Sequence, residues 1–206
     1  DTLHERRFTN DASRFTGERM TFNLTLTGAD LLLLLPESLL TFWLCVVLTV
    51  DFVWPRMPKE QVAYLSVGGL AAVLGTLIWF DQGGISGALF NNMFVLDRMA
   101  LFFKIFIVLS TMLVILASMD YVHRFRFFQG EYYVLVLMSA LGMMFMASAN
   151  DLLSVFVTLE FSTFGFYVLV AYLREDMASN EAGLKFFILG IFAAGLLAYG
   201  ISLVYG

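Results

Sequence analysis

Six long apolar stretches, separated by short polar connections, dominate this sequence. A bilayer has a hydrocarbon core about 30 Å thick, so a helix that crosses it needs about 20 mostly apolar residues. The short connections require neighbouring helices to run antiparallel. We therefore predict an all-α fold, a polytopic membrane helix bundle. The predicted helices cover residues 31–54, 61–80, 95–118, 131–149, 151–173 and 181–205.

The composition supports a membrane chain, because 60% of the residues are hydrophobic and 14% are charged. A soluble domain has about a quarter charged residues. Residues 1–20 form a polar N-terminal tail in which four arginines are offset by four acids, and residues 21–206 form the transmembrane bundle. A large soluble enzymatic domain is excluded, and so is nucleic-acid binding, because the chain has no dense basic patch.

The single cysteine and the two histidines lie far apart in the sequence. Cys45 lies in an apolar stretch, while His4 is in the tail and His123 follows the third predicted helix. This spacing provides neither a disulfide framework nor a Cys/His metal site. We therefore expect no metal and no redox cofactor to be bound by motifs of this chain.

Basic residues in the connections predict the orientation of the bundle. The connections after the first, third and fifth predicted helices are the basic ones; they hold Arg56, Lys59, Arg124, Arg126 and Arg174. Lys and Arg favour the negative side of the membrane, so the odd-numbered helices are expected to end on the cytoplasm-like or matrix-like side. The N-terminal tail then lies on the opposite side.

Charged residues inside the apolar stretches are the main functional candidates, because each one is costly in a bilayer. Glu160 follows Asp151 by nine residues, which at 1.5 Å per residue places it about 13 to 14 Å along the fifth helix, near the bilayer midplane. A carboxyl group at that depth must be protonated or must face a cation or water. Either state suits proton transfer, whereas the structural alternative is a hydrogen bond.

Three other charged residues and one acid near a helix start are weaker candidates. Lys185 follows Glu181 by four residues, a spacing that suits a local ion pair, so pairing and proton relay remain equal readings. Lys104 is expected to pair with a neighbouring helix or to take part in proton transfer. Glu37 follows Pro36, and we interpret both as residues of the first turn of a helix.

The sequence from residue 148 onward resembles subunit 2 of respiratory NADH:ubiquinone oxidoreductase (complex I), the N-type antiporter-like subunit. Weaker similarities are Pro36-Glu37, Asp97 and Phe103-Lys104, so the resemblance covers residues 20–206. The segments that carry it best are 148–153 (SANDLL), 159–160 (LE), 167–169 (YVL), 181–187 (EAGLKFF) and 199–201 (YGI).

This resemblance implies a proton-translocating membrane module of an oxidoreductase complex, built on an inverted-repeat fold of about fourteen helices. It implies that Glu160 modulates the charge of a nearby lysine and that Lys185 is the lysine opening the sixth helix. It places NADH, flavin, iron–sulfur clusters and ubiquinone in other subunits, and it makes other membrane-arm subunits and lipids the partners. The mitochondrial inner membrane is the expected location, ahead of a bacterial inner membrane.

Only the first six helices of that fold have counterparts here, and the central lysine of the seventh is absent. We therefore expect a split subunit, in which a second polypeptide supplies the remaining helices. Two other functions remain open. One is a structural scaffold whose charged residues serve assembly. The other is a cation/proton antiporter; the six helices count against it, because such a transporter needs both halves of its site.

Overall fold

The computed structural model describes residues 28–54, 59–90, 92–122, 129–173 and 175–205. These residues confirm an all-α membrane bundle. The tail at 1–20 lies outside the described residues, as do four basic residues used to predict the orientation, Arg56, Arg124, Arg126 and Arg174. The orientation therefore stays a prediction.

Six helices of the described residues are long and apolar enough to cross a membrane. Lipid supplies no hydrogen-bond partners, so each crossing segment satisfies its backbone groups within its own helix. Every predicted helix overlaps an observed one, and the ends differ by four residues or fewer. The six are α3 (Leu35–Val53), α4 (Lys59–Gly83), α5 (Arg98–Val122), α6 (Gln129–Ser148), α7 (Leu152–Val170) and α8 (Met177–Tyr205).

The first predicted helix is interrupted, which corrects the continuous helix expected over residues 31–54. A short helix, α2 (Gly28–Leu33), ends at a turn at Leu34, and α3 follows it. Pro36 explains the break, because it lacks an N–H group and its ring clashes with the carbonyl four residues earlier. The first backbone bond of α3 runs from Ser38 N to Leu34 O over 2.9 Å.

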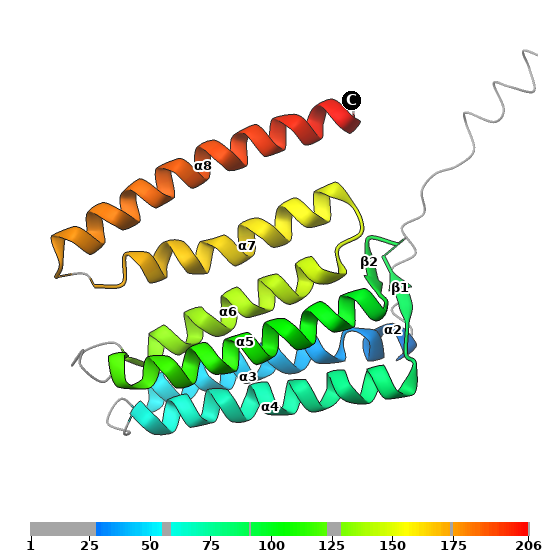
Figure 1. Ribbon diagram of the computed structural model, residues 1–206, viewed down its shortest axis with the longest axis horizontal. Helices are drawn as coiled ribbons and strands as arrows, with labels where there is room; N and C mark the ends of the chain where they lie inside the picture. The colour runs from blue at the N-terminus through cyan, green and yellow to red at the C-terminus, as the bar shows by residue number, and fades with distance from the viewer. Residues whose placement is uncertain (1–27, 55–58, 91, 123–128, 174, 206) are drawn as a thin grey trace, which may run out of the picture.

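Helix α6 is the centre of the bundle, since it contacts α3, α4, α5 and α7. The buried core comes mainly from α3 to α6. Figure 1 shows α8 at one edge of the bundle, beside α7, with most of its surface free of other elements. Gly183 is the one buried residue in α8, within the part of the chain that the structure describes.

A small β-hairpin, which the sequence analysis did not predict, closes one end of the bundle. Strands β1 (Gly87–Leu89) and β2 (Phe94–Leu96) pair antiparallel, so residues 95 and 96 are strand and not the start of the third helix. The turn between them contains Phe90 and Asn92 at positive φ, a conformation that Asn tolerates better than Phe. The hairpin is attached to the α6–α7 connection, where Asn150 N donates to Met93 O over 3.0 Å.

Candidate functional site

Glu37 and Lys104 form an ion pair inside the bundle. The Lys104 Nζ and Glu37 Oε1 atoms are 2.5 Å apart, and the two side chains are 0% and 1% exposed. Glu37 lies in the first turn of α3, as the sequence predicted. The interpretation of Glu37 as only a helix-start residue is wrong, however, because its carboxylate is buried against Lys104 of α5. The expectation that Lys104 pairs with a neighbouring helix is confirmed.

The hairpin completes the surroundings of this ion pair. The Lys104 Nζ atom lies 4.8 Å from the centroid of the Phe94 ring, a cation–π distance. Phe94 itself packs edge-on against Phe145 of α6 and forms a β-bridge with Ala149. Three segments far apart in the sequence therefore fix the position of the ammonium group.

Glu160 lies near the middle of α7 and is half-buried. The residue precedes Tyr167 by two helical turns, so the two share one face of α7. Tyr167 contacts α8, since its ring lies 5.1 Å from that of Phe186 between centroids. Within the described residues, no hydrogen bond or ion pair involves the Glu160 carboxylate; the Thr163 hydroxyl bonds the Leu159 and Glu160 carbonyls instead.

Lys185 and Glu181 form the local pair that their spacing predicts. Lys185 Nζ lies 2.5 Å from Glu181 Oε1, and the side chains are 69% and 66% exposed among the described residues. An ion pair so exposed contributes little to stability by itself. Its position on the open side of α8 leaves both residues accessible to further helices.

The packing of α7 against α8 keeps Glu160 and Lys185 apart. Gly183 lies level with Ala171, because an added Cβ atom would sit 3.1 Å from the Ala171 Cα. Glu160 is eleven residues from Ala171, and Lys185 is two residues from Gly183 toward the same end of the pair of antiparallel helices. At 1.5 Å per residue the two are separated by about 13 to 14 Å along the axis. Lys185 is therefore not the direct partner of Glu160 in this structure.

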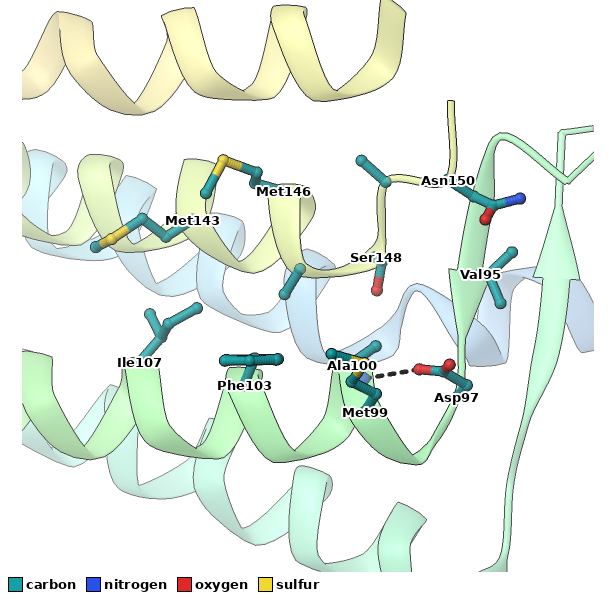
Figure 2. A pocket seen from close by; sticks show the side chains of 12 residues that line it. Val95, Asp97, Met99, Ala100, Phe103, Ile107, Met143, Met146, Ser148 and Asn150 are labelled. Carbon is teal, nitrogen blue, oxygen red and sulfur yellow. Dashed lines mark hydrogen bonds between the residues drawn. The ribbon is translucent and has the colours of Figure 1, made fainter. Parts of the chain in front are cut away.

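A cavity of about 420 Å³ lies between the start of α5 and the end of α6 (Figure 2). Its polar lining residues are Asp97, Ser148 and Asn150. Asp97 accepts a hydrogen bond from Ala100 N over 2.7 Å and so caps α5. The Ser148 hydroxyl points toward this helix start in Figure 2, and it has no hydrogen-bond partner among the described residues.

Comparison with known proteins identifies the relatives of this chain. The family model described as "NADH:quinone oxidoreductase/Mrp antiporter, TM" matches residues 149–206. NADH-quinone oxidoreductase subunit N of Desulfitobacterium hafniense is 43% identical over 161 residues, which are 76% of this chain and 32% of that protein. This chain is a homologue of subunit N.

Two further matches cover more of the chain. Chloroplastic NAD(P)H-quinone oxidoreductase subunit 2 of Chlorokybus atmophyticus is 34% identical over 189 residues, 91% of this chain and 36% of that protein. A chain in the structure of Thermus thermophilus respiratory complex I with bound aureothin has a TM-score of 0.68 and 28% identity. The match covers 83% of this chain and 36% of that one.

These matches confirm the resemblance noted in the sequence and set its limits. The chain spans about a third of the length of the subunit N relatives it matches. Most of these relatives are bacterial, so they support a multi-pass membrane protein without supporting a mitochondrial one. Glu160, Glu181 and Lys185 fall inside the matched family region, whereas Glu37 and Lys104 precede it.

Proposed function

We propose that this chain is part of a proton-translocating membrane-arm subunit of NADH:quinone oxidoreductase. The observation that carries the proposal is the half-buried Glu160 in the middle of a membrane helix, within the segment that matches the NADH:quinone oxidoreductase/Mrp antiporter family model. A carboxyl group at that depth is costly unless it serves a charge or a proton. NADH oxidation and quinone reduction, with flavin and iron–sulfur clusters, take place in other subunits under this proposal.

Glu160 acts in this proposal as an electrostatic switch. Its face of α7 also carries Tyr167, so the carboxylate lies on the side of α7 on which α8 packs. A cation brought to that side favours the ionised carboxylate, and removal of the cation favours the protonated one. We propose that this cation belongs to helices outside the present chain.

Lys185 acts as a relay at the other end of α8, and Glu181 holds its ammonium in the resting state. The separation of about 13 to 14 Å along the axis is too long for direct transfer from Glu160. Water or side chains of additional helices must connect the two residues. The open surface around Lys185 supports such an arrangement.

Replacement of Glu160 by Gln tests the function. Loss of a proton-transferring group slows the step it serves by about 100-fold or more. We therefore expect the purified complex to assemble and to oxidise NADH, but to move fewer protons per electron pair into proteoliposomes. Glu175→Gln, the same chemical change at an exposed acid outside the helices, should leave the proton count unchanged.

Two other outcomes would favour the other functions. Loss of the assembled complex, with normal proton movement in what survives, would favour the structural scaffold. Proton movement that depends on an added cation gradient and not on NADH would favour an antiporter, the second activity that the matched family description names.

We also propose that the remaining helices of the subunit come from a second polypeptide. The support is the surface of α8, where large apolar side chains remain uncovered by the described part of the chain. The exposed fractions of Phe187, Phe192 and Leu196 are 42%, 71% and 73%. Together with the charged Glu181–Lys185 pair on the same helix, which avoids lipid, this surface supports additional helices beside α8. An intact-mass measurement of the subunit in the purified complex would overturn the split if it showed one longer chain.

The location in the mitochondrial inner membrane is a separate proposal. The arginine, serine and threonine content of residues 1–20 supports it, because import signals are rich in arginine and serine; the four acids of this segment are atypical of such signals. Recovery of the chain in mitochondrial membranes after fractionation would support it, and recovery in a bacterial cell membrane would overturn it.

A further inference from the structure

The ion pair of Glu37 and Lys104 has no role in the function proposed above. It occupies a fully buried position between membrane helices α3 and α5. Removal of two charges from water is costly, and their mutual attraction compensates only when further hydrogen bonds satisfy the remaining donors and acceptors. The hydrogen bonding of this pair therefore decides how stable its ionised form is.

That hydrogen bonding is incomplete. Apart from the Lys104 Nζ–Glu37 Oε1 contact itself, neither carboxylate oxygen of Glu37 nor the Lys104 ammonium makes a hydrogen bond within the part of the chain that the structure describes. The Phe94 ring covers one side of the ammonium and accepts no conventional hydrogen bond. The ionised form is thus poorly stabilised. The neutral form differs from it only by transfer of one proton from Nζ to Oε1, atoms that are 2.5 Å apart.

Asp97 is the other charged group that acts on Lys104. It precedes Lys104 by seven residues and remains exposed at the start of α5. Arg98, the next residue, is also exposed there. A carboxylate that is open to solvent therefore lies two helical turns from the buried ammonium, at the same end of the bundle.

The cavity between α5 and α6 lies beside the segment of α5 that carries Lys104. Its lining extends from Asp97 and Ser148 to Ala100 and Phe103, and Phe103 directly precedes Lys104. Ser148 is 2% exposed, and its hydroxyl lacks a partner among the described residues. A buried polar group without a protein partner in a cavity of this size is commonly satisfied by water. Water bound at Ser148 would thus lie beside this part of α5, although Glu37 and Lys104 do not themselves line the cavity.

We infer that Glu37 and Lys104 form a second proton-exchange site, distinct from Glu160 and open toward the hairpin end of the bundle. A proton from cavity water binds the Glu37 carboxylate, which gives a carboxylic acid beside an uncompensated ammonium and changes the charge of the pair from zero to plus one. Release of that proton to water restores the pair. The use of this exchange in translocation rests on the proposed function; the exchange itself does not.

Two double variants test this site without leaving a lone buried charge. Glu37→Met/Lys104→Met replaces the pair by flexible apolar side chains, an exchange that buried ion pairs tolerate better than loss of one partner. Glu37→Gln/Lys104→Gln keeps polar groups and serves if the first variant fails to assemble. Both are compared with the wild-type complex and with Glu175→Gln by infrared difference spectroscopy across a pH jump and by proton counting.

A carboxyl band that appears on acidification in the wild type and in Glu175→Gln, but not in the double variants, would support proton exchange at Glu37. An unchanged band in an assembled double variant would overturn it. We expect the double variants to assemble. They should lower the number of protons moved per electron pair to the level of Glu160→Gln. A double variant that moves as many protons as the wild type would overturn the use of this site in translocation. A wild-type complex that moves no protons would refute the proposed function of the chain. It would not refute proton exchange at Glu37, because the infrared experiment tests that exchange separately.

Discussion

Single residues show what spacing along one helix can and cannot predict. The position of Glu160 near the middle of α7 was predictable, because Asp151 marks the start of that helix and its side chain accepts from Ser154 N over 2.6 Å. The burial of Glu37 was not. Its partner Lys104 lies on a different helix, and no pattern within α3 indicates which residue α5 presents to it.

The cap at Asp151 gives a prediction at this scale. Asp151→Ala removes the acceptor for Ser154 N and should lower the stability of α7 by about 1 kcal/mol. Asp151→Asn keeps an acceptor and should stay within a few tenths of the wild type. Unfolding of the purified complex in SDS, followed by proteolysis of the α6–α7 connection, measures the difference. Equal stability of the Ala and Asn variants would show that the cap is unimportant.

Secondary-structure elements were predicted well where a long apolar stretch determines the helix, and poorly where a turn determines where an element begins or ends. The six membrane helices follow from apolar stretches long enough to cross a bilayer. The hairpin was missed because its strands are three residues each, too short for an alternating pattern to be distinguished from a polar loop. The break at Leu34 was missed because Pro36 was interpreted only as a residue of a first helical turn, and not as a residue that also ends a preceding helix.

The contact between α6 and α7 depends on a glycine. A Cβ atom at Gly142 would lie 2.8 Å from the Ser162 Cα and N atoms, and backbone cannot move aside as a side chain end can. We expect Gly142→Ala to cost about 1 to 3 kcal/mol, in the range of overpacked cores, and to reduce the amount of assembled complex on native gels.

Gly75 in α4 is the matched control for this substitution. An added Cβ atom there would meet no atom within 4 Å. Gly75→Ala should leave assembly unchanged or slightly improved, since Ala is favoured over Gly in a helix by about 1 kcal/mol. Equal loss of complex in both variants would mean that the α6–α7 contact is not the cause.

At the scale of the whole molecule, the bundle is asymmetric. Helices α3 to α6 enclose the core, whereas α8 packs mainly on α7 and presents most of its apolar surface outward. Apolar side chains facing lipid are unremarkable in a membrane protein, so this surface alone does not reveal a partner. Its Glu181–Lys185 pair is different, because charged side chains avoid lipid and favour protein or water.

Photo-crosslinking tests which of these surroundings α8 has in the complex. A benzophenone amino acid at Leu196, which is 73% exposed, should form adducts with another protein helix in the assembled complex. The same residue in the dissociated chain in detergent should form adducts with detergent alone. Lipid adducts alone in the assembled complex would show that this side of α8 faces the bilayer.

The burial of Glu37 against Lys104 also constrains how the chain is made. Insertion that starts from the N-terminus delivers Glu37 to the membrane 67 residues before Lys104, so the acid waits there for its counterion. During that interval α3 carries an unpaired carboxyl group, which makes its release into lipid by itself unfavourable. We expect the insertion machinery to retain α3 until α5 emerges, so that the two helices enter the lipid together.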